Sequence, residues 1–226
     1  MALNDKKRQK KREQKNLKRK EKVQSKPRGA PLGKKAANFA GFPVYETLVP
    51  EKLFDTGIGS VLLAREIPNG HLAVSAFVVD VFCLGIKNGL FQVFSESYYR
   101  QRFKPQFIES QEGDVEEIDP SCLKKIIEGA RGYAEDLGFK PHRDYYSAKD
   151  LLKGIDTNDC PVSYTFGKDG KPFYVRGPKE TLGQAQRIVH QLQDKCGEDG
   201  FHHLIILDEP EQSRLRPQPN TEQRAH

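Results

Sequence analysis

The chain has 226 residues, 36% of them hydrophobic, which suits one domain or two small ones. The formal net charge of +6 hides two opposite parts: residues 1–35 carry 15 Lys/Arg and 3 Asp/Glu (+12), and the other residues carry 22 and 28 (−6). No run approaches the roughly 18 apolar residues of a membrane span, and the N-terminus lacks the apolar stretch of a signal peptide. We therefore expect a cytoplasmic protein without a membrane partner.

Residues 1–41 predict a disordered basic arm followed by a linker. Segment 5–22 has almost no apolar side chain except Leu17, too little to offset the entropy of ordering, and 26–41 is rich in Pro and Gly. Cations this concentrated would displace the counterions of a nucleic acid. The interpretation is that the arm binds RNA, in preference to DNA, or another polyanion; the alternative is a solubilising tail. The arm cations concerned are Lys6, Lys7, Arg8, Lys10, Lys11, Arg12, Lys15, Lys18, Arg19 and Lys20.

The globular part, 42–207, opens with a predicted β-hairpin. Two β-like runs, 58–67 and 72–86, flank Pro68-Asn69-Gly70, and Asn-Gly between apolar runs favours a tight turn with positive φ. A two-residue turn would place Asp80 opposite Gly59. A short helix is expected over 95–104, and the acidic segment 110–120 predicts a loop and a possible subdomain boundary.

Two helices and a second hairpin follow. Asp119 and Pro120 suit the start of a helix whose apolar residues recur to 137, where Gly138 ends it. Asp144 is expected to cap a second short helix that ends near 152. The alternation of 162–166, the turn at Asp169-Gly170 and the return at 173–175 predict the second hairpin.

The C-terminal part predicts a helix over 182–192 that Gly197 ends, a closing strand over 201–207 and a disordered polar tail, 208–226. The fold class is therefore α+β: two β-hairpins and a C-terminal strand packed with three to four helices. The four cysteines are widely spaced and form no CxxC pair. We expect them to be free thiols rather than disulfides.

Asp80 is the most unusual polar residue, because it stands inside the most apolar run of the chain. A catalytic interpretation joins it with three further polar residues, Lys87, His142 and Asp144, in one cleft of a hydrolase or nuclease. The structural alternative is a buried carboxylate that accepts N–H bonds from loop 56–60 or pairs with Arg65 or Lys87. We favour the structural alternative.

Two further segments combine cations with aromatic residues. Segment 166–178 could present a ligand-contacting hairpin to an anion through Lys168, Lys171, Tyr174 and Arg176. Segment 98–104 could bind nucleic acid by stacking and phosphate contact through Arg100, Arg102 and Lys104, or could be an amphipathic helix that buries its aromatic residues. No complete metal or cofactor motif occurs, so neither a metal nor a cofactor is expected.

Three blocks, "VDVFCLGIKN" (79–88), "YAEDLGFKPHRDYYSAKDLLKGID" (133–156) and "FGKDGKPFYVRGP" (166–178), together resemble an uncharacterised family of bacterial proteins. The resemblance implies only that about 43–205 form one recurrent unit, and it assigns no site residue. Three functions follow from the residues: RNA or ribonucleoprotein binding through the arm, a small hydrolase or nuclease, or a protein-interaction module with solubilising tails.

Overall fold

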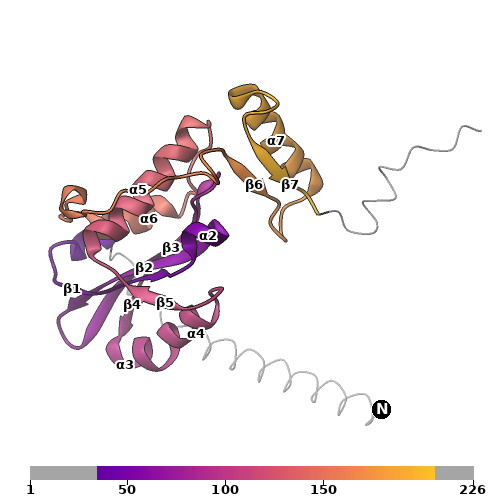
Figure 1. Ribbon diagram of the computed structural model, residues 1–226. Coiled ribbons are helices and arrows are strands. Elements are labelled where there is room, and N and C mark those ends of the chain that lie inside the picture. Colours follow the sequence, from indigo (N-terminus) through magenta and orange to yellow (C-terminus); the bar gives the residue numbers. More distant parts are fainter. Residues whose placement is uncertain (1–34, 207–226) are drawn as a thin grey trace, which may run out of the picture.

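The computed structural model of the protein describes residues 35–206 and confirms the α+β class (Figure 1). The strands are β1 (Val44–Pro50), β2 (Ile58–Ile67), β3 (His71–Asp80), β4 (Gly85–Ser95), β5 (Val115–Glu117), β6 (Phe173–Val175) and β7 (His202–Leu204). The helices are η1 (Ala36–Phe39), α2 (Leu53–Thr56), α3 (Glu96–Tyr98), η2 (Tyr99–Phe103), α4 (Lys104–Glu109), α5 (Pro120–Asp136), α6 (Tyr145–Ala148), η3 (Lys149–Leu152), η4 (Thr157–Asp159) and α7 (Leu182–Cys196).

A five-stranded antiparallel sheet in the order β4-β3-β2-β1-β5 forms the centre of the fold. One face packs against α5, α6 and η3, and the other against η2 and α4, so the sheet lies between two helical layers (Figure 1). The predicted linker ends earlier than expected, because Ala36 and Phe39 of η1 are buried in the first core. The arm before residue 35 and the tail from 207 lie outside the described residues.

The first hairpin forms as expected, but its register differs by one residue. Ile67 pairs with His71, so Pro68, Asn69 and Gly70 make a three-residue loop with positive φ at its last two positions. Proline has no N–H to give to the ladder, which explains why Pro68 stays in the loop. Asp80 therefore lies opposite Ile58 and not Gly59.

The expected strand 72–86 is wrong in its extent. The chain reverses after Asp80 in a turn at 81–84 and returns as β4, which pairs with β3 along its length. Gly85 enters β4 with φ +66, a conformation that favours glycine. The acidic segment that predicted only a loop contains β5, which pairs with β1.

The second hairpin is also wrong. Asp169-Gly170 does form a tight turn, closed by a bridge between Lys168 and Lys171, but 162–166 is not a strand. Its aromatic residues serve packing instead: Tyr164 stacks on Phe54 with 5.2 Å between the ring centroids. β6 pairs in parallel with β7, and α7 connects them as a small βαβ unit.

The helices with local capping signals are the ones predicted well. Asp119 accepts the N–H of Ser121 at the start of α5, and Thr181 forms a capping box at the start of α7. The helix expected over 95–104 continues to Glu109 through the π-helical turn η2. Asp144 precedes α6, but its side chain makes no capping bond because its backbone is already helical.

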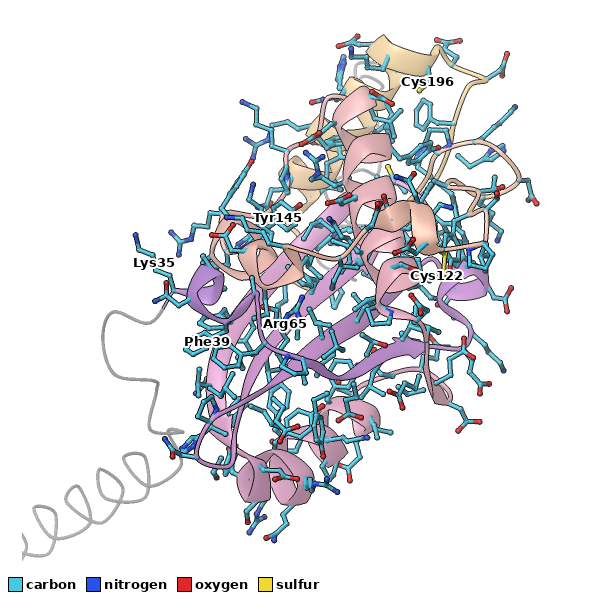
Figure 2. All side chains as sticks on the ribbon, turned by 90° about the vertical axis from the view of Figure 1, so that its left-hand side faces the viewer. Lys35, Phe39, Arg65, Cys122, Tyr145 and Cys196 are labelled. Carbon is cyan, nitrogen blue, oxygen red and sulfur yellow. A yellow bond between two sulfur atoms is a disulfide. The ribbon has the colours of Figure 1, made fainter. Side chains whose placement is uncertain are left out.

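Arg65 of β2 is a buried cation that binds carbonyl groups (Figure 2). Its guanidinium donates to the carbonyl oxygens of Phe42, Leu151 and Lys153. The expected alternative of an Arg65–Asp80 pair is therefore wrong. Two of the acceptors lie at the C-terminal end of the α6–η3 helical run, where the helix dipole favours positive charge. Burial lowers the pKa of Arg65 below its ordinary value.

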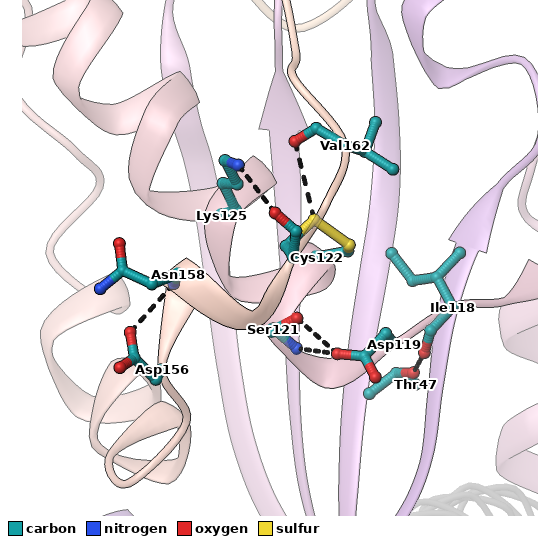
Figure 3. The surroundings of a disulfide bond; sticks show 10 residues. Thr47, Ile118, Asp119, Ser121, Cys122, Lys125, Asp156, Asn158 and Val162 are labelled. Carbon is teal, nitrogen blue, oxygen red and sulfur yellow. Dashed lines mark hydrogen bonds between the residues drawn. A yellow bond between two sulfur atoms is a disulfide. The ribbon is translucent and has the colours of Figure 1, made fainter.

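A disulfide between Cys122 and Cys160 overturns the expectation of four free thiols (Figure 3). The two residues are 38 positions apart in the chain, and the fold brings the first turn of α5 beside the end of η4. Neither the wide spacing of the cysteines nor the expected cytoplasmic location indicated this pair. Cys83 and Cys196 remain free.

We predict that Arg65→Met lowers the free energy of unfolding by about 2–4 kcal/mol, because three carbonyl acceptors lose their donor inside the protein. Arg65→Lys should also destabilise, since one ammonium cannot reproduce the planar fork. Urea unfolding followed by circular dichroism measures the change. Arg187→Met on α7, an exposed arginine, is the matched control and should stay near wild type; a wild-type midpoint for Arg65→Met would contradict the role assigned to this side chain.

Titration of the unfolded, unreduced chain with a thiol reagent should detect two thiols, and four after reduction. Loss of a link that closes a loop of this length is expected to reduce the free energy of unfolding by about 4 kcal/mol. Cys122→Ala/Cys160→Ala should reproduce the effect of reduction. Four thiols before reduction would show that the link does not form.

Candidate functional site

Asp80 closes the turn between β3 and β4. Its Oδ1 accepts the N–H groups of Phe82 and Cys83 at 3.0 and 2.9 Å, and the residue is buried. Burial raises the pKa of Asp80 above its ordinary range, while Lys87 and the backbone donors oppose this rise. The carboxylate therefore stabilises its own turn, and not loop 56–60, which contacts the same turn through Val81 N–H and the carbonyl of Gly57.

Lys87 belongs to a partly buried network centred on Glu180, which precedes α7. Lys87 Nζ lies 2.8 Å from Glu180 Oε1, and Glu180 Oε2 accepts the hydroxyl of Tyr174 at 2.6 Å and the N–H of Gly177 at 3.1 Å. Burial alone would raise the pKa of Glu180, but these hydrogen bonds and the charge of Lys87 lower it. The network joins the start of β4 to the βαβ unit.

Tyr174 and Lys87, which were assigned to different candidate sites, thus meet at Glu180. The sequence analysis did not identify Glu180. Tyr174 was expected on a ligand-contacting hairpin and Lys87 in a catalytic cleft, and both now donate to the same carboxylate. Arg176 donates to the main-chain carbonyl of Glu180 at 2.8 Å. The only local sign of Glu180 is its place beside Thr181, the capping residue of α7.

His142 and Asp144 lie elsewhere, on the exposed segment that precedes α6. Their side chains approach each other at 3.6 Å, and Asp144 lies 3.6 Å from Arg143. Within residues 35–206, no hydrogen bond or ion pair joins them to Asp80 or Lys87. His142 and Asp144 therefore form a pair of their own, whereas Lys87 pairs with Glu180 and its charge also acts on the pKa of Asp80.

The other cations of the predicted hairpin also make structural contacts. Lys168 Nζ lies 5.0 Å from the ring centroid of Phe173, and Lys171 donates to the carbonyl of Asp199 at 2.9 Å. These contacts tie the Asp169-Gly170 turn to the βαβ unit.

The helix that follows β4 matches its amphipathic interpretation. Tyr99 is fully buried, Arg100 pairs with Glu96 at 2.8 Å, and Lys104 pairs with the buried Glu46. Arg102 is exposed. A polar hollow of about 390 Å³ lies here, and its cations already have carboxylate partners; its lining is Tyr45, Glu46, Arg100, Lys104 and Glu117.

A mostly apolar hollow of about 280 Å³ lies where α4 leaves the second face of the sheet uncovered. Residues of β3 and β4 form its floor, and residues of η2 and α4 form one wall; they include Ala76, Val78, Leu90, Phe103 and Phe107.

An exposed aromatic surface occurs on α6, and the sequence reasoning did not single it out. Tyr146 is 54% exposed, and Lys149 Nζ lies 5.3 Å from its ring centroid. The neighbouring Arg143 has an 89% exposed side chain. The succession of an arginine, a tyrosine pair and a lysine in "RDYYSAK" (143–149) was a signal of the same kind as 98–104.

In the part of the chain that the structure describes, no group of three or more His, Cys, Asp and Glu residues is placed to hold a metal ion. That same part contains no helix long and apolar enough to cross a membrane. No family model, curated protein or solved structure matches this chain. The resemblance to a bacterial family therefore stays a prediction.

Asp80→Asn should keep the fold, because its amide oxygen can still accept both turn N–H groups, whereas Asp80→Ala should lose about 1–3 kcal/mol. The pH dependence of the free energy of unfolding separates the effect of the negative charge of Asp80 from the effect of the hydrogen bonds that its side chain accepts. A raised native pKa means that the native state binds the proton more tightly, so wild-type stability should fall as pH rises from about 4 through that pKa.

The Asp80→Asn protein should lack this decline and equal or exceed the wild type in stability at neutral pH. Urea unfolding at a series of pH values measures both effects. Asp144→Asn, at an exposed position, is the control and should follow the wild-type curve. Failure of Asp80→Asn to fold at neutral pH would show that the turn needs the negative charge.

Proposed function

We propose that the protein binds RNA, in preference to DNA, through its basic N-terminal arm. The observation that carries the proposal is the separation of charge along the chain: +12 in residues 1–35 and −6 in the rest. The described residues 36–206 contain 19 Lys/Arg and 24 Asp/Glu, so the arm is far more basic than the body to which it is joined. Binding of this kind releases counterions and depends strongly on salt but little on sequence.

The start of the described chain suits an arm that is presented from a rigid body. Lys35 is exposed, and the next residue, Ala36, is buried together with Phe39. Arg65 then binds the carbonyl of Phe42. The described residues that follow the arm, which we call the body, therefore hold residues 35–42, the root of the arm, in a defined place.

A cytoplasmic location is part of the proposal and is the reason for preferring RNA. Disulfides are rare in that compartment. Cys122 and Cys160 are both buried, however, which restricts the attack of a thiolate on the bond between them. The proposal is thus compatible with a Cys122–Cys160 link.

The alternatives receive less support from the geometry. A hydrolase would need Asp80 free to act, but this carboxylate already accepts two N–H bonds in its own turn. A protein-interaction module could use the apolar hollow beside α4, but no feature of the described residues indicates which partner would fill it.

Replacement of Lys6, Lys7 and Arg8 by Gln in the full chain should weaken binding to a single-stranded RNA by about tenfold or more near physiological salt. The slope of log affinity against log salt should decrease by about 2, since each phosphate contact contributes about 0.7 for single strands. Fluorescence anisotropy over a salt series measures both quantities.

The matched control removes three exposed cations from the body instead, Lys179, Arg187 and Lys195. It should leave affinity and salt slope near wild type. Equal losses in the two triple variants would argue against the arm as the binding element, and tighter binding to DNA than to RNA of the same length would overturn the preference for RNA.

A further inference from the structure

We infer that the exposed surface around Tyr146, which includes Lys149 and Arg143, is a stacking platform for unpaired bases of the nucleic acid held by the arm. This inference rests on the proposed function and extends it from a charged arm to a defined surface of the body. It names the class of ligand as single-stranded RNA.

The chemistry of the surface fits an unpaired base with its phosphate. Tyr146 offers an exposed ring, and Lys149 lies 5.3 Å from its centroid and 5.8 Å from that of Tyr145. Aromatic rings interleaved with cations bind single strands, because every base has a face for stacking and every nucleotide has a phosphate. A duplex would offer mainly phosphates to this surface, since its bases are stacked inside.

The platform is held rigidly, so little ordering entropy is lost when a base binds. The N–H of His142 donates to the carbonyl of Ile86 on β4 at 2.9 Å. Gly89 of β4 lets the chain at Asp144 and Tyr145 come close, because a Cβ there would lie 2.8 Å from Tyr145 N. Tyr145 is buried, and its ring packs edge-on against Phe77 and Tyr146.

The platform lies beside the root of the arm. η1 packs against η3, which continues α6, and Arg65 binds both Phe42 of the arm root and Lys153 of the platform segment. Lys35, Phe39 and Tyr145 appear on the same side of the molecule in Figure 2. The described chain therefore begins beside the helical run that carries Tyr146.

The segment that carries the platform is itself basic, although acidic residues are near: Glu128 and Glu135 of α5, together with Arg131, act on the pKa of Tyr145. Segment 140–153 contains four Lys/Arg and two Asp. Its acidic residues lie 3.6 Å from Arg143 and 2.9 Å from Lys153 in exposed pairs. Exposed pairs of this kind contribute little, so both cations stay available to phosphate.

The test compares full-length variants for binding to an unpaired 20-nucleotide RNA and to a duplex of equal length, by anisotropy over a salt series. Tyr146→Ala should weaken single-strand binding by about tenfold, with an unchanged salt slope, because stacking and not a phosphate contact is lost. Tyr146→Phe should retain wild-type affinity. Lys149→Gln should decrease the salt slope by about one.

His203→Ala is the matched control, since His203 of β7 is also an exposed ring but stacks on Phe201 in the βαβ unit, outside both segments that combine cations with aromatic residues. It should bind as wild type does. Unchanged single-strand affinity of Tyr146→Ala, or wild-type protein that binds the duplex as tightly as the single strand, would overturn the platform.

The arm variant separates the two proposals. If the Lys6, Lys7 and Arg8 replacement weakens binding while Tyr146→Ala does not, the arm binds RNA and the platform is wrong. If wild-type protein binds neither RNA, both the proposed function and the platform are wrong. Equal thermal unfolding curves for wild type and Tyr146→Ala establish that the folded body is the same in both.

Discussion

The guanidinium of Arg65 determines how three parts of the molecule meet. Taking a cation out of water costs several kcal/mol. Within residues 35–206 no carboxylate pairs with Arg65, and the carbonyls of Phe42, Leu151 and Lys153 compensate for this cost instead. Because these acceptors come from the root of the arm and from the end of the α6–η3 run, one side chain of the sheet fixes both. The positions of Phe42 and of the helical run that carries Tyr146 therefore follow from an interaction in the core.

The polar residues that looked most functional in the sequence hold the structure together instead. Asp80 satisfies its own turn, and Lys87 and Tyr174 meet at Glu180 to join the βαβ unit to the sheet. Such residues are conspicuous because burial of a charge demands partners. Exposed residues are less conspicuous, since Tyr146 shows only the mixture of aromatic and basic residues that segment 98–104 shows as well.

Elements with a local signal could be predicted from the sequence, and those that depend on distant partners could not. The starts of α5 and α7 follow from Asp119 and Thr181, whose capping bonds reach only two or three residues along the chain, and from Pro120 in the first turn of α5. The partner of β6 is β7, almost thirty residues later, and no local pattern encodes it. The pair of Glu180 with Lys87 and the link between Cys122 and Cys160 were missed for the same reason, because the tertiary fold alone brings these partners near.

Gly89 has a consequence for synthesis of the chain. β4 is an edge strand of the sheet. The N–H of His142 covers part of that edge at the carbonyl of Ile86, and Gly89, which has no side chain, lets the chain at Asp144 and Tyr145 lie against the strand. Uncovered edges invite pairing with other chains. Ribosomes add about 5–20 residues per second, so β4 emerges several seconds before the segment that shields it. During that interval the nascent protein exposes a strand edge that the finished molecule partly covers, and early chaperone binding would protect it.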